Sequence, residues 1–148
     1  MGLLPCLSIF ILFILPILHP SLALDSLRQS QFITDNGTTL VSKDGTFELG
    51  LFTPGTSNKR YLGIWYKNIP VQTVVWVANR LNPINGSSVT LTMTTSGDLV
   101  LSQNNTVLWS TNSSAKAQSP IARLLDTGNL VVMDENEVDP DAFFVAKL

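Results

Sequence analysis

The stretch Ser96-Gly97-Asp98-Leu99-Val100 has a similar copy 31 residues later, Thr127-Gly128-Asn129-Leu130-Val131. A looser third copy begins at Asp44-Gly45-Thr46-Phe47. In each copy a glycine stands between polar residues and is followed by an apolar run, which is the pattern of a tight turn leading into a strand. Repetition of one hairpin unit predicts a domain assembled from three similar small sheets.

A second repeated element carries tryptophan. Val75-Trp76-Val77-Ala78-Asn79 is echoed by Leu108-Trp109-Ser110-Thr111-Asn112, and Trp65 lies in the aromatic run Tyr61–Tyr66. An exposed tryptophan can stack on a sugar, whereas a buried one removes on the order of 200 Å² from water. Because all three tryptophans stand inside apolar runs, we expect Trp65, Trp76 and Trp109 to form the core where the sheets meet.

The other apolar residues also predict strands rather than helices. No long segment has an apolar period of 3.6 residues, and short β-rich runs alternate with turn signals such as Pro54-Gly55 and Asn85-Gly86. The pattern indicates an all-β domain with about ten short strands. The expected strands are Phe47–Leu51, Tyr61–Tyr66, Val74–Ala78, Val89–Met93, Leu99–Leu101, Val107–Trp109, Ile121–Leu125 and Leu130–Met133.

Residues 1–23 have the composition of a secretory signal peptide. Sixteen of them are apolar and none is charged, Leu7–Leu15 forms the apolar segment, and Ser21-Leu22-Ala23 places small residues before the cleavage point. The alternative is an uncleaved membrane anchor, but two prolines interrupt a run that is shorter than the roughly 20 residues of a membrane span. We therefore expect a secreted, extracellular product that begins at Leu24.

Composition excludes several classes of function. The single cysteine and the single histidine, Cys6 and His19, both lie in the leader, so the rest of the chain has neither a thiol nor an imidazole for catalysis or zinc binding. A net charge of −2 is too balanced for a nucleic-acid binder. A glycosidase needs two carboxylates. Asp98 and Asp126 are the candidates, but both stand beside a turn glycine, which explains them without catalysis. We expect no enzyme activity, no metal and no cofactor.

The secretory prediction gives meaning to four Asn-x-Ser/Thr sequons. All four coincide with turn residues, so we expect each asparagine to be exposed and at least two to carry N-linked glycan. The acceptor residues are Asn36, Asn85, Asn104 and Asn112.

The order of these motifs resembles the bulb-type (mannose-binding) lectin domain at the N-terminus of plant S-domain, or G-type lectin, receptor-like serine/threonine kinases. The resemblance implies a β-prism of three four-stranded subdomains over residues 24–141, with the full-length members at the cell surface. The matching segments are Leu40-Val41-Ser42, Phe47-Glu48-Leu49-Gly50-Leu51-Phe52, Tyr61-Leu62-Gly63-Ile64-Trp65-Tyr66, Val75-Trp76-Val77-Ala78-Asn79-Arg80, Trp109-Ser110-Thr111-Asn112 and Leu124-Leu125-Asp126-Thr127-Gly128-Asn129-Leu130-Val131.

The resemblance also implies a mannose site with the pattern Gln-x-Asp-x-Asn-x-Val-x-Tyr, whose polar side chains bind hydroxyls and whose valine packs on the sugar ring. The candidate carbohydrate-binding residues are Thr127, Asn129 and Val131 in one copy and Asp98 and Val100 in another. Most of the pattern's other positions differ, and Asp44, Thr46 and Glu48 do not restore it in the third copy. A site built for hydroxyls loses most of its discrimination without its polar partners. We therefore expect no measurable binding of a single mannose.

Residues 142–148 diverge from the family, whose members continue after Asp134–Glu137 into a Trp-Gln-Ser-Phe strand, further modules, a membrane span and a kinase. We expect a truncated product of such a receptor gene, in which Phe143-Phe144-Val145 either replaces the closing strand or stays an exposed tail. An open strand edge predicts a homodimer. The expected partner is a glycan or an extracellular protein. The alternative is an interaction or decoy module that does not bind sugar and pairs with intact S-domain receptor kinases.

Overall fold

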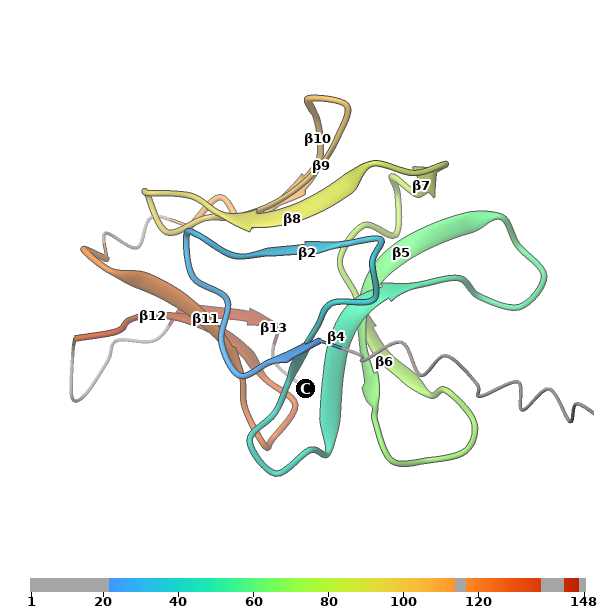
Figure 1. Cartoon of the computed structure of the whole chain (residues 1–148), viewed down its shortest axis with the longest axis horizontal. Coiled ribbons are helices and arrows are strands. Elements are labelled where there is room, and N and C mark those ends of the chain that lie inside the picture. Colours follow the sequence, from blue (N-terminus) through green and yellow to red (C-terminus); the bar gives the residue numbers. More distant parts are fainter. Residues whose placement is uncertain (1–21, 114–116, 137–142, 147–148) are drawn as a thin grey trace, which may run out of the picture.

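The computed structural model describes residues 22–113, 117–136 and 143–146, with the side chain of Val145 as the only one described in the last segment. All secondary-structure elements in these residues are β-strands, and the strands form three main sheets around one centre (Figure 1). The predicted all-β fold with three sheets is confirmed. The predicted leader lies outside the described residues except for Leu22 and Ala23.

The first sheet has the strand order β1-β3-β4-β5-β6, and β7 pairs with β5 beside this path. Its pairs are antiparallel except for β1, which runs parallel to β3. The pairing of β4 with β5 forms its centre, in register from Phe47 opposite Tyr66 to Phe52 opposite Tyr61. The strands are β1 (Ala23–Leu24), β3 (Thr39–Val41), β4 (Phe47–Phe52), β5 (Lys59–Tyr66), β6 (Val74–Val77) and β7 (Ile84–Asn85).

The second sheet has the order β10-β9-β8-β2 and is fully antiparallel. The expected number is four strands in each sheet, and this sheet has four. Within the described residues the first sheet has six strands and the third has three. Its strands are β2 (Phe32–Thr34), β8 (Val89–Met93), β9 (Leu99–Gln103) and β10 (Thr106–Ser110).

The third sheet has the order β11-β12-β13, with β11 (Pro120–Leu124), β12 (Leu130–Asp134) and β13 (Phe143–Ala146). The backbone of β13 pairs antiparallel with β12 of the same chain. Of the two alternatives for the C-terminal segment, the structure therefore has the closing strand.

The predicted repeat is visible in three hairpin turns: the β8–β9 turn (Thr94–Asp98), the β11–β12 turn (Leu125–Asn129) and the β3–β4 turn (Ser42–Phe47). In each turn the N–H of the first residue donates to the carbonyl of the last, at 2.8, 2.8 and 3.0 Å respectively. The glycine N–H donates to the carbonyl of the first residue, at 3.1, 2.8 and 2.9 Å. Each glycine has a positive φ (+88°, +84° and +78°), a conformation that glycine adopts without steric strain.

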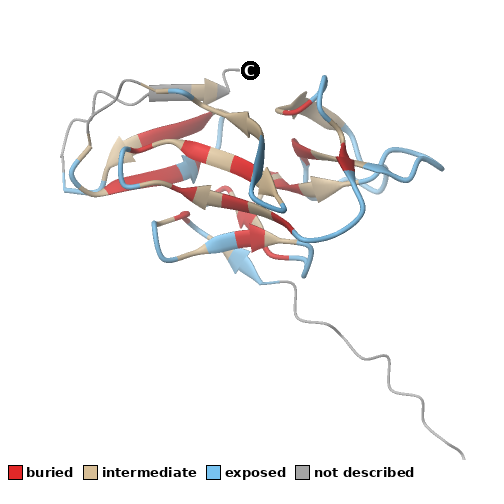
Figure 2. Cartoon of the chain, turned by 90° about the horizontal axis from the view of Figure 1, so that it is seen from above, coloured by how far each residue is buried: buried red, intermediate tan, exposed pale blue. Residues whose placement is uncertain are grey.

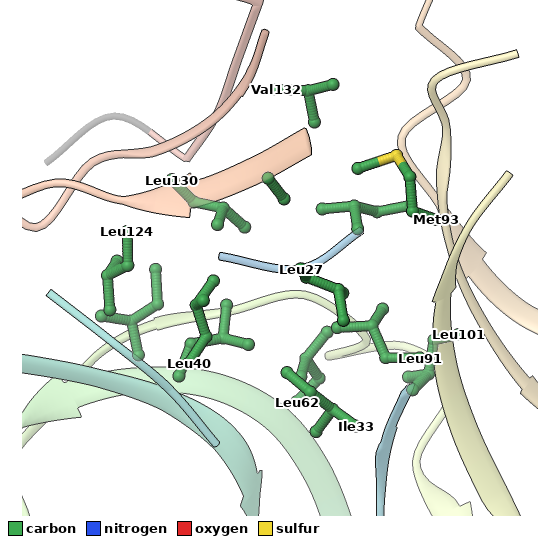
Figure 3. Close-up of a cluster of buried hydrophobic side chains, with 14 of the residues drawn as sticks. Leu27, Ile33, Leu40, Leu62, Leu91, Met93, Leu101, Leu124, Leu130 and Val132 are labelled. Atoms are coloured by element: carbon green, nitrogen blue, oxygen red, sulfur yellow. The ribbon is translucent and has the colours of Figure 1, made fainter. Parts of the chain in front are cut away.

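One apolar core joins the three sheets, and buried residues occupy the strands while loops are exposed (Figure 2). Leu27, between β1 and β2, lies among side chains from all three sheets (Figure 3). Its N–H donates to the carbonyl of Ala122 at 2.9 Å, and its carbonyl accepts from the N–H of Ala122 at 3.0 Å. This pair of hydrogen bonds ties the N-terminal segment to β11. The buried members of the core are Leu27, Ile33, Leu40, Phe47, Leu49, Leu62, Ile64, Ile84, Val89, Leu91, Met93, Leu99, Leu101, Ala122, Leu124, Leu130 and Val132.

The prediction that all three tryptophans form this core is confirmed only in part. Trp65 is 8% exposed, but it lies outside the core cluster, on the opposite face of β5 from the core residue Ile64. Trp76 and Trp109 pack against the core yet are only half-buried, with their rings edge to face at a centroid distance of 5.9 Å. Because β6 and β10 are edge strands, part of the surface of these two rings stays exposed.

The outer face of the first sheet is covered by aromatic rings that need a pair of glycines beneath them. Gly50 and Gly63 are directly opposite each other on β4 and β5. A Cβ on Gly63 would lie 2.6 Å from Cε1 of Phe52, and a Cβ on Gly50 would lie 3.0 Å from Cη2 of Trp65. Close approach of this kind is a reason for glycine inside a strand. It fixes the positions of both rings on the outer face.

Candidate functional site

The five candidate carbohydrate-binding residues lie in two different sheets. Thr127, Asn129 and Val131 follow one another at every second position along the β11–β12 turn and β12, whereas Asp98 and Val100 belong to the β8–β9 turn and β9. Residues two apart share a face only within a strand, and of these five residues only Val131 and Val100 lie within strands, whereas Thr127, Asn129 and Asp98 lie in the turns. The pairing of the strands keeps the two sets in separate sheets, so they do not combine into one site.

In the third sheet, the position that should pack on a sugar ring is covered. Val131 is 0% exposed, and its backbone lies between Arg123 of β11 and Phe144 of β13. Thr127 is exposed and Asn129 is half-buried. A ring could therefore reach Val131 only if its neighbours moved aside.

In the second sheet, Asp98 already holds several hydrogen bonds from its own domain. Its Oδ1 accepts from the backbone N–H of Ser113 at 2.6 Å and from the hydroxyl of Thr111 at 3.1 Å. Its Oδ2 accepts from the hydroxyl of Ser96 at 3.0 Å. The carboxylate thereby ties the chain after β10 to the β8–β9 turn, while Val100 is half-buried on β9.

The pKa of Asp98 reflects this set of contacts. Desolvation by the surrounding residues acts to raise the pKa, but the N–H of Ser113 and the hydroxyls of Ser96 and Thr111 together hold it below its usual value. Hydrogen bonds to the charged form stabilise the ion. Asp98 is thus a turn-fixing carboxylate at neutral pH rather than a protonated general acid.

The polar groups of the third copy are also engaged. Glu48 accepts hydrogen bonds from the Thr39 hydroxyl at 2.8 Å and from Nε1 of Trp65 at 3.1 Å, and Nζ of Lys67 lies 3.7 Å from it. The backbone N–H of Asp44 donates to Oδ1 of Asp126 at 3.0 Å, which joins the β3–β4 and β11–β12 turns. The two carboxylates considered for glycosidase chemistry, Asp98 and Asp126, therefore both take part in turn contacts.

All four sequon asparagines are exposed, as predicted. At Asn36 the side-chain oxygen accepts hydrogen bonds from the N–H of Thr38 at 3.0 Å and from its hydroxyl at 2.6 Å. Asn104 and Asn112 have positive φ angles of 49° and 46°, which asparagine tolerates better than most residues. Attachment of glycan at these four positions stays a prediction.

A cavity of about 600 Å³ lies between the first and third sheets. Its charged lining is mixed in sign, with Asp25, Lys43, Arg123 and Asp126. A smaller cavity, of about 330 Å³, lies at the end of the first sheet and is lined by apolar and aromatic residues and by Arg80. Sequence reasoning did not single out Arg80. The signal was a cation two residues after the apolar run Val74–Ala78, with no acidic residue on either side.

Comparison with known proteins agrees with this geometry. A family model for D-mannose binding lectin matches residues 73–144. The chain is therefore similar to the lectin domains of this family over these residues. A G-type lectin S-receptor-like serine/threonine-protein kinase of Arabidopsis thaliana is 43% identical over 86% of this chain and 15% of its own length. The receptor-like serine/threonine-protein kinase SD1-8 of the same plant is 44% identical over 82% of this chain and 15% of its own length.

Solved structures share the fold of this domain. A monomeric monocot mannose-binding lectin from Gastrodia elata superposes with a TM-score of 0.59 at 18% identity, over 83% of this chain and 94% of its own. A Marasmius oreades lectin superposes with a TM-score of 0.58 at 20% identity, over 81% of this chain and 87% of its own. These matches confirm the predicted β-prism. The chain spans about 15% of the length of the receptor kinases it matches. Within the described residues no helix is long and apolar enough to cross a membrane.

Proposed function

We propose that this lectin domain acts outside the cell as a recognition module without catalytic activity, of the kind found in S-domain receptor ectodomains. The observation that carries the proposal is the combination of an intact scaffold with altered mannose positions. The three turns and three sheets of the fold are kept, while Val131 is covered and Asp98 is held by its own loop. The domain therefore presents loops and sheet faces for recognition, with mannose itself a poor ligand.

Export through the secretory pathway is part of the proposal. The expected cleavage point, between Ala23 and Leu24, lies inside β1, and the carbonyl of Leu22 accepts a 3.1 Å hydrogen bond from the N–H of Thr39. Cleavage would remove that bond and half of this two-residue strand. Mass spectrometry of the secreted chain should find Leu24 as the first residue. Secreted protein that still begins at Met1 would contradict the prediction.

A protein ligand is the second candidate, and exposed apolar side chains favour it. Val71 is 75% exposed and Ile69 is 44% exposed in the loop between β5 and β6, and Leu81 is 93% exposed after β6. Ile69 and Val71 lie on one exposed loop, whereas Leu81 lies beyond the other end of β6, and neighbouring exposed apolar residues are a feature of interaction surfaces. Under this alternative, the chain pairs with the ectodomain of an intact S-domain receptor kinase.

One pair of measurements tests both candidates. The secreted chain is applied to a glycan array and, separately, to immobilised S-domain receptor ectodomain. A saturable glycan signal supports the lectin-like module. An empty array with receptor binding that Val71→Ser weakens, but that Val107→Ser on β10 of the second sheet does not, supports the protein-binding alternative. Failure of both assays would overturn the proposed function.

A further inference from the structure

The cavity of about 330 Å³ at the end of the first sheet is separate from the mannose positions. Its lining residues are Phe52, Pro54, Tyr61, Val77 and Arg80. They come from the end of β4, the following loop, the start of β5 and the segment that ends β6. The cavity is open to solvent, and its volume is at the lower limit of ligand-binding pockets, which suits one small ring rather than a long chain.

One wall of this cavity is aromatic. Phe52 and Tyr61 are directly opposite each other on β4 and β5, with ring centroids 6.0 Å apart and planes tilted by 37°. Both side chains are partly exposed. Gly63 leaves the space into which the Phe52 ring fits, so that ring is held in place. Aromatic faces of this kind pack on apolar surface, while the Tyr61 hydroxyl supplies a polar edge.

The other feature of the cavity is the guanidinium group of Arg80, which has no acidic partner among the described residues. Arg80 is exposed, and among the described residues it has no hydrogen-bond or ion-pair partner. By contrast, Arg28 pairs with Glu135 and Arg60 pairs with Asp35. No acidic residue lines the cavity. A guanidinium group presents a planar set of donors that matches a carboxylate in two parallel hydrogen bonds.

The residue before Arg80 fixes the backbone at this place. Asn79 is 2% exposed, and its Oδ1 accepts a hydrogen bond from the N–H of Leu62 at 2.8 Å. Its Nδ2 donates to the carbonyl of Asn82 at 2.9 Å. The side chain of Asn79 therefore joins β5 to the segment after β6, and Arg80 starts from a fixed point beside the cavity.

We propose that this cavity binds a sugar that carries a carboxylate, a hexuronate. Arg80 binds the carboxylate, the rings of Phe52 and Tyr61 pack on the C–H face of the sugar, and the Tyr61 hydroxyl bonds a ring hydroxyl. The inference rests on the proposed recognition function and assigns it a ligand class at a site that the mannose pattern does not include. A neutral hexose lacks the group that pairs with Arg80.

The test is a titration of the secreted chain with D-galacturonate. Binding is measured by calorimetry and by NMR of the arginine side chains. D-Galactose and the methyl ester of D-galacturonate serve as neutral controls. We expect saturable binding that weakens as NaCl is added, because salt screens exposed charges. Arg80→Gln should weaken binding about tenfold or more, since charge-assisted hydrogen bonds are roughly twice as strong as neutral ones. Lys43→Gln, which removes a cation at the opposite end of β4, should change the affinity less than twofold.

Three results would overturn the assignment: no saturable response to D-galacturonate, equal binding of the neutral controls, or unchanged affinity in folded Arg80→Gln. The glycan array keeps this failure distinct from failure of the recognition function. A chain that binds neutral glycans but not D-galacturonate retains the proposed function and lacks the hexuronate site. A chain that binds neither on the array nor to the receptor ectodomain lacks the function itself.

Discussion

The backbone N–H of Ser113 donates a 2.6 Å hydrogen bond to Oδ1 of Asp98, across the gap between the end of β10 and the β8–β9 turn. This contact places Asp98 among the residues that hold the domain together. A carboxylate at a position where the family pattern expects a sugar ligand thus fixes a loop instead.

Replacing Asp98 should destabilise the domain rather than change sugar binding. Asp98→Ala removes the acceptor for Ser113, Thr111 and Ser96, and we expect a loss of about 1–2 kcal/mol in the free energy of unfolding. Urea unfolding followed by tryptophan fluorescence measures it. Exposed Thr127→Ala is the matched control and should change stability by less than about 0.5 kcal/mol. Equal stability of the two variants would contradict a structural role for Asp98.

Stability should fall in acid and stay level near neutral pH. Four carboxyl groups have lowered pKa values in the folded chain: Asp44, Asp98, Asp134 and Glu135. The main cause is a backbone hydrogen bond from Thr46 for Asp44 and one from Asn136 for Asp134. For Glu135 the main cause is the hydrogen bond from the Arg28 side chain. A carboxyl whose folded pKa is depressed contributes stability above its unfolded pKa, about 3.9 for Asp and 4.3 for Glu, and that contribution is lost as the pH falls through the folded pKa.

Thermal melts from pH 3 to pH 8 check this expectation. Residues 24–148 contain no histidine, the side chain that ordinarily titrates in the range near neutral pH. We therefore expect nearly constant melting temperatures between about pH 5 and 7 and a steady decrease below about pH 4. A maximum of stability below pH 4 would be the opposite of what these carboxylates predict.

The glycine pair beneath the aromatic rings should not tolerate a methyl group. In Gly63→Ala the new Cβ would lie 2.6 Å from Cε1 of Phe52 and 2.9 Å from the backbone oxygen of Trp76, so we expect a loss of about 1–3 kcal/mol. A double-mutant cycle with Phe52→Ala separates the two contacts. The double variant should recover part of the loss, because the ring is gone while the backbone contact stays. Strictly additive effects would show that Phe52 and Gly63 are not coupled.

The C-terminal strand should matter for stability and solubility. Val145 packs against the core, and β13 covers the edge of β12. Deleting residues 142–148 should lower stability by about 2 kcal/mol or more and expose an unpaired edge that recruits other chains. We expect the full chain to be partly dimeric at micromolar concentration through strand exchange, in which β13 of one chain pairs with β12 of another. Light scattering of both forms checks this: a clean monomer whose melting and solubility do not change on deletion would contradict it.

The turns could be predicted from sequence because glycine, aspartate and asparagine determine local backbone geometry. The repeats at Gly97 and Gly128 therefore gave the three-sheet fold. The positions of the tryptophans could not be predicted in the same way. Alternation along β5 places Trp65 on the face opposite Ile64, but nothing local to the sequence says which face meets the core.

Other features depend on pairing between distant segments. β2 is three residues long and is held by β8, whose sequence lies far along the chain. The covering of Val131 depends on where β13 pairs, and the cavity beside Arg80 needs the junction of β4, β5 and β6. The sequence pattern identified Val131 as a candidate, but its exposure is a property of the assembled sheet.

Titration of the secreted chain with D-mannose tests the central claim most directly, which is that the lectin scaffold is kept while its mannose positions do not bind mannose. Leu125 and Met133 stand where the pattern has Gln and Tyr. Each lost hydrogen-bond partner is worth about 0.5–1.5 kcal/mol, so the loss of these two weakens a site by roughly tenfold or more. Burial of Val131 removes the ring contact as well. We predict no saturable signal at millimolar mannose by calorimetry. Saturable binding that disappears in Asn129→Ala would contradict the claim.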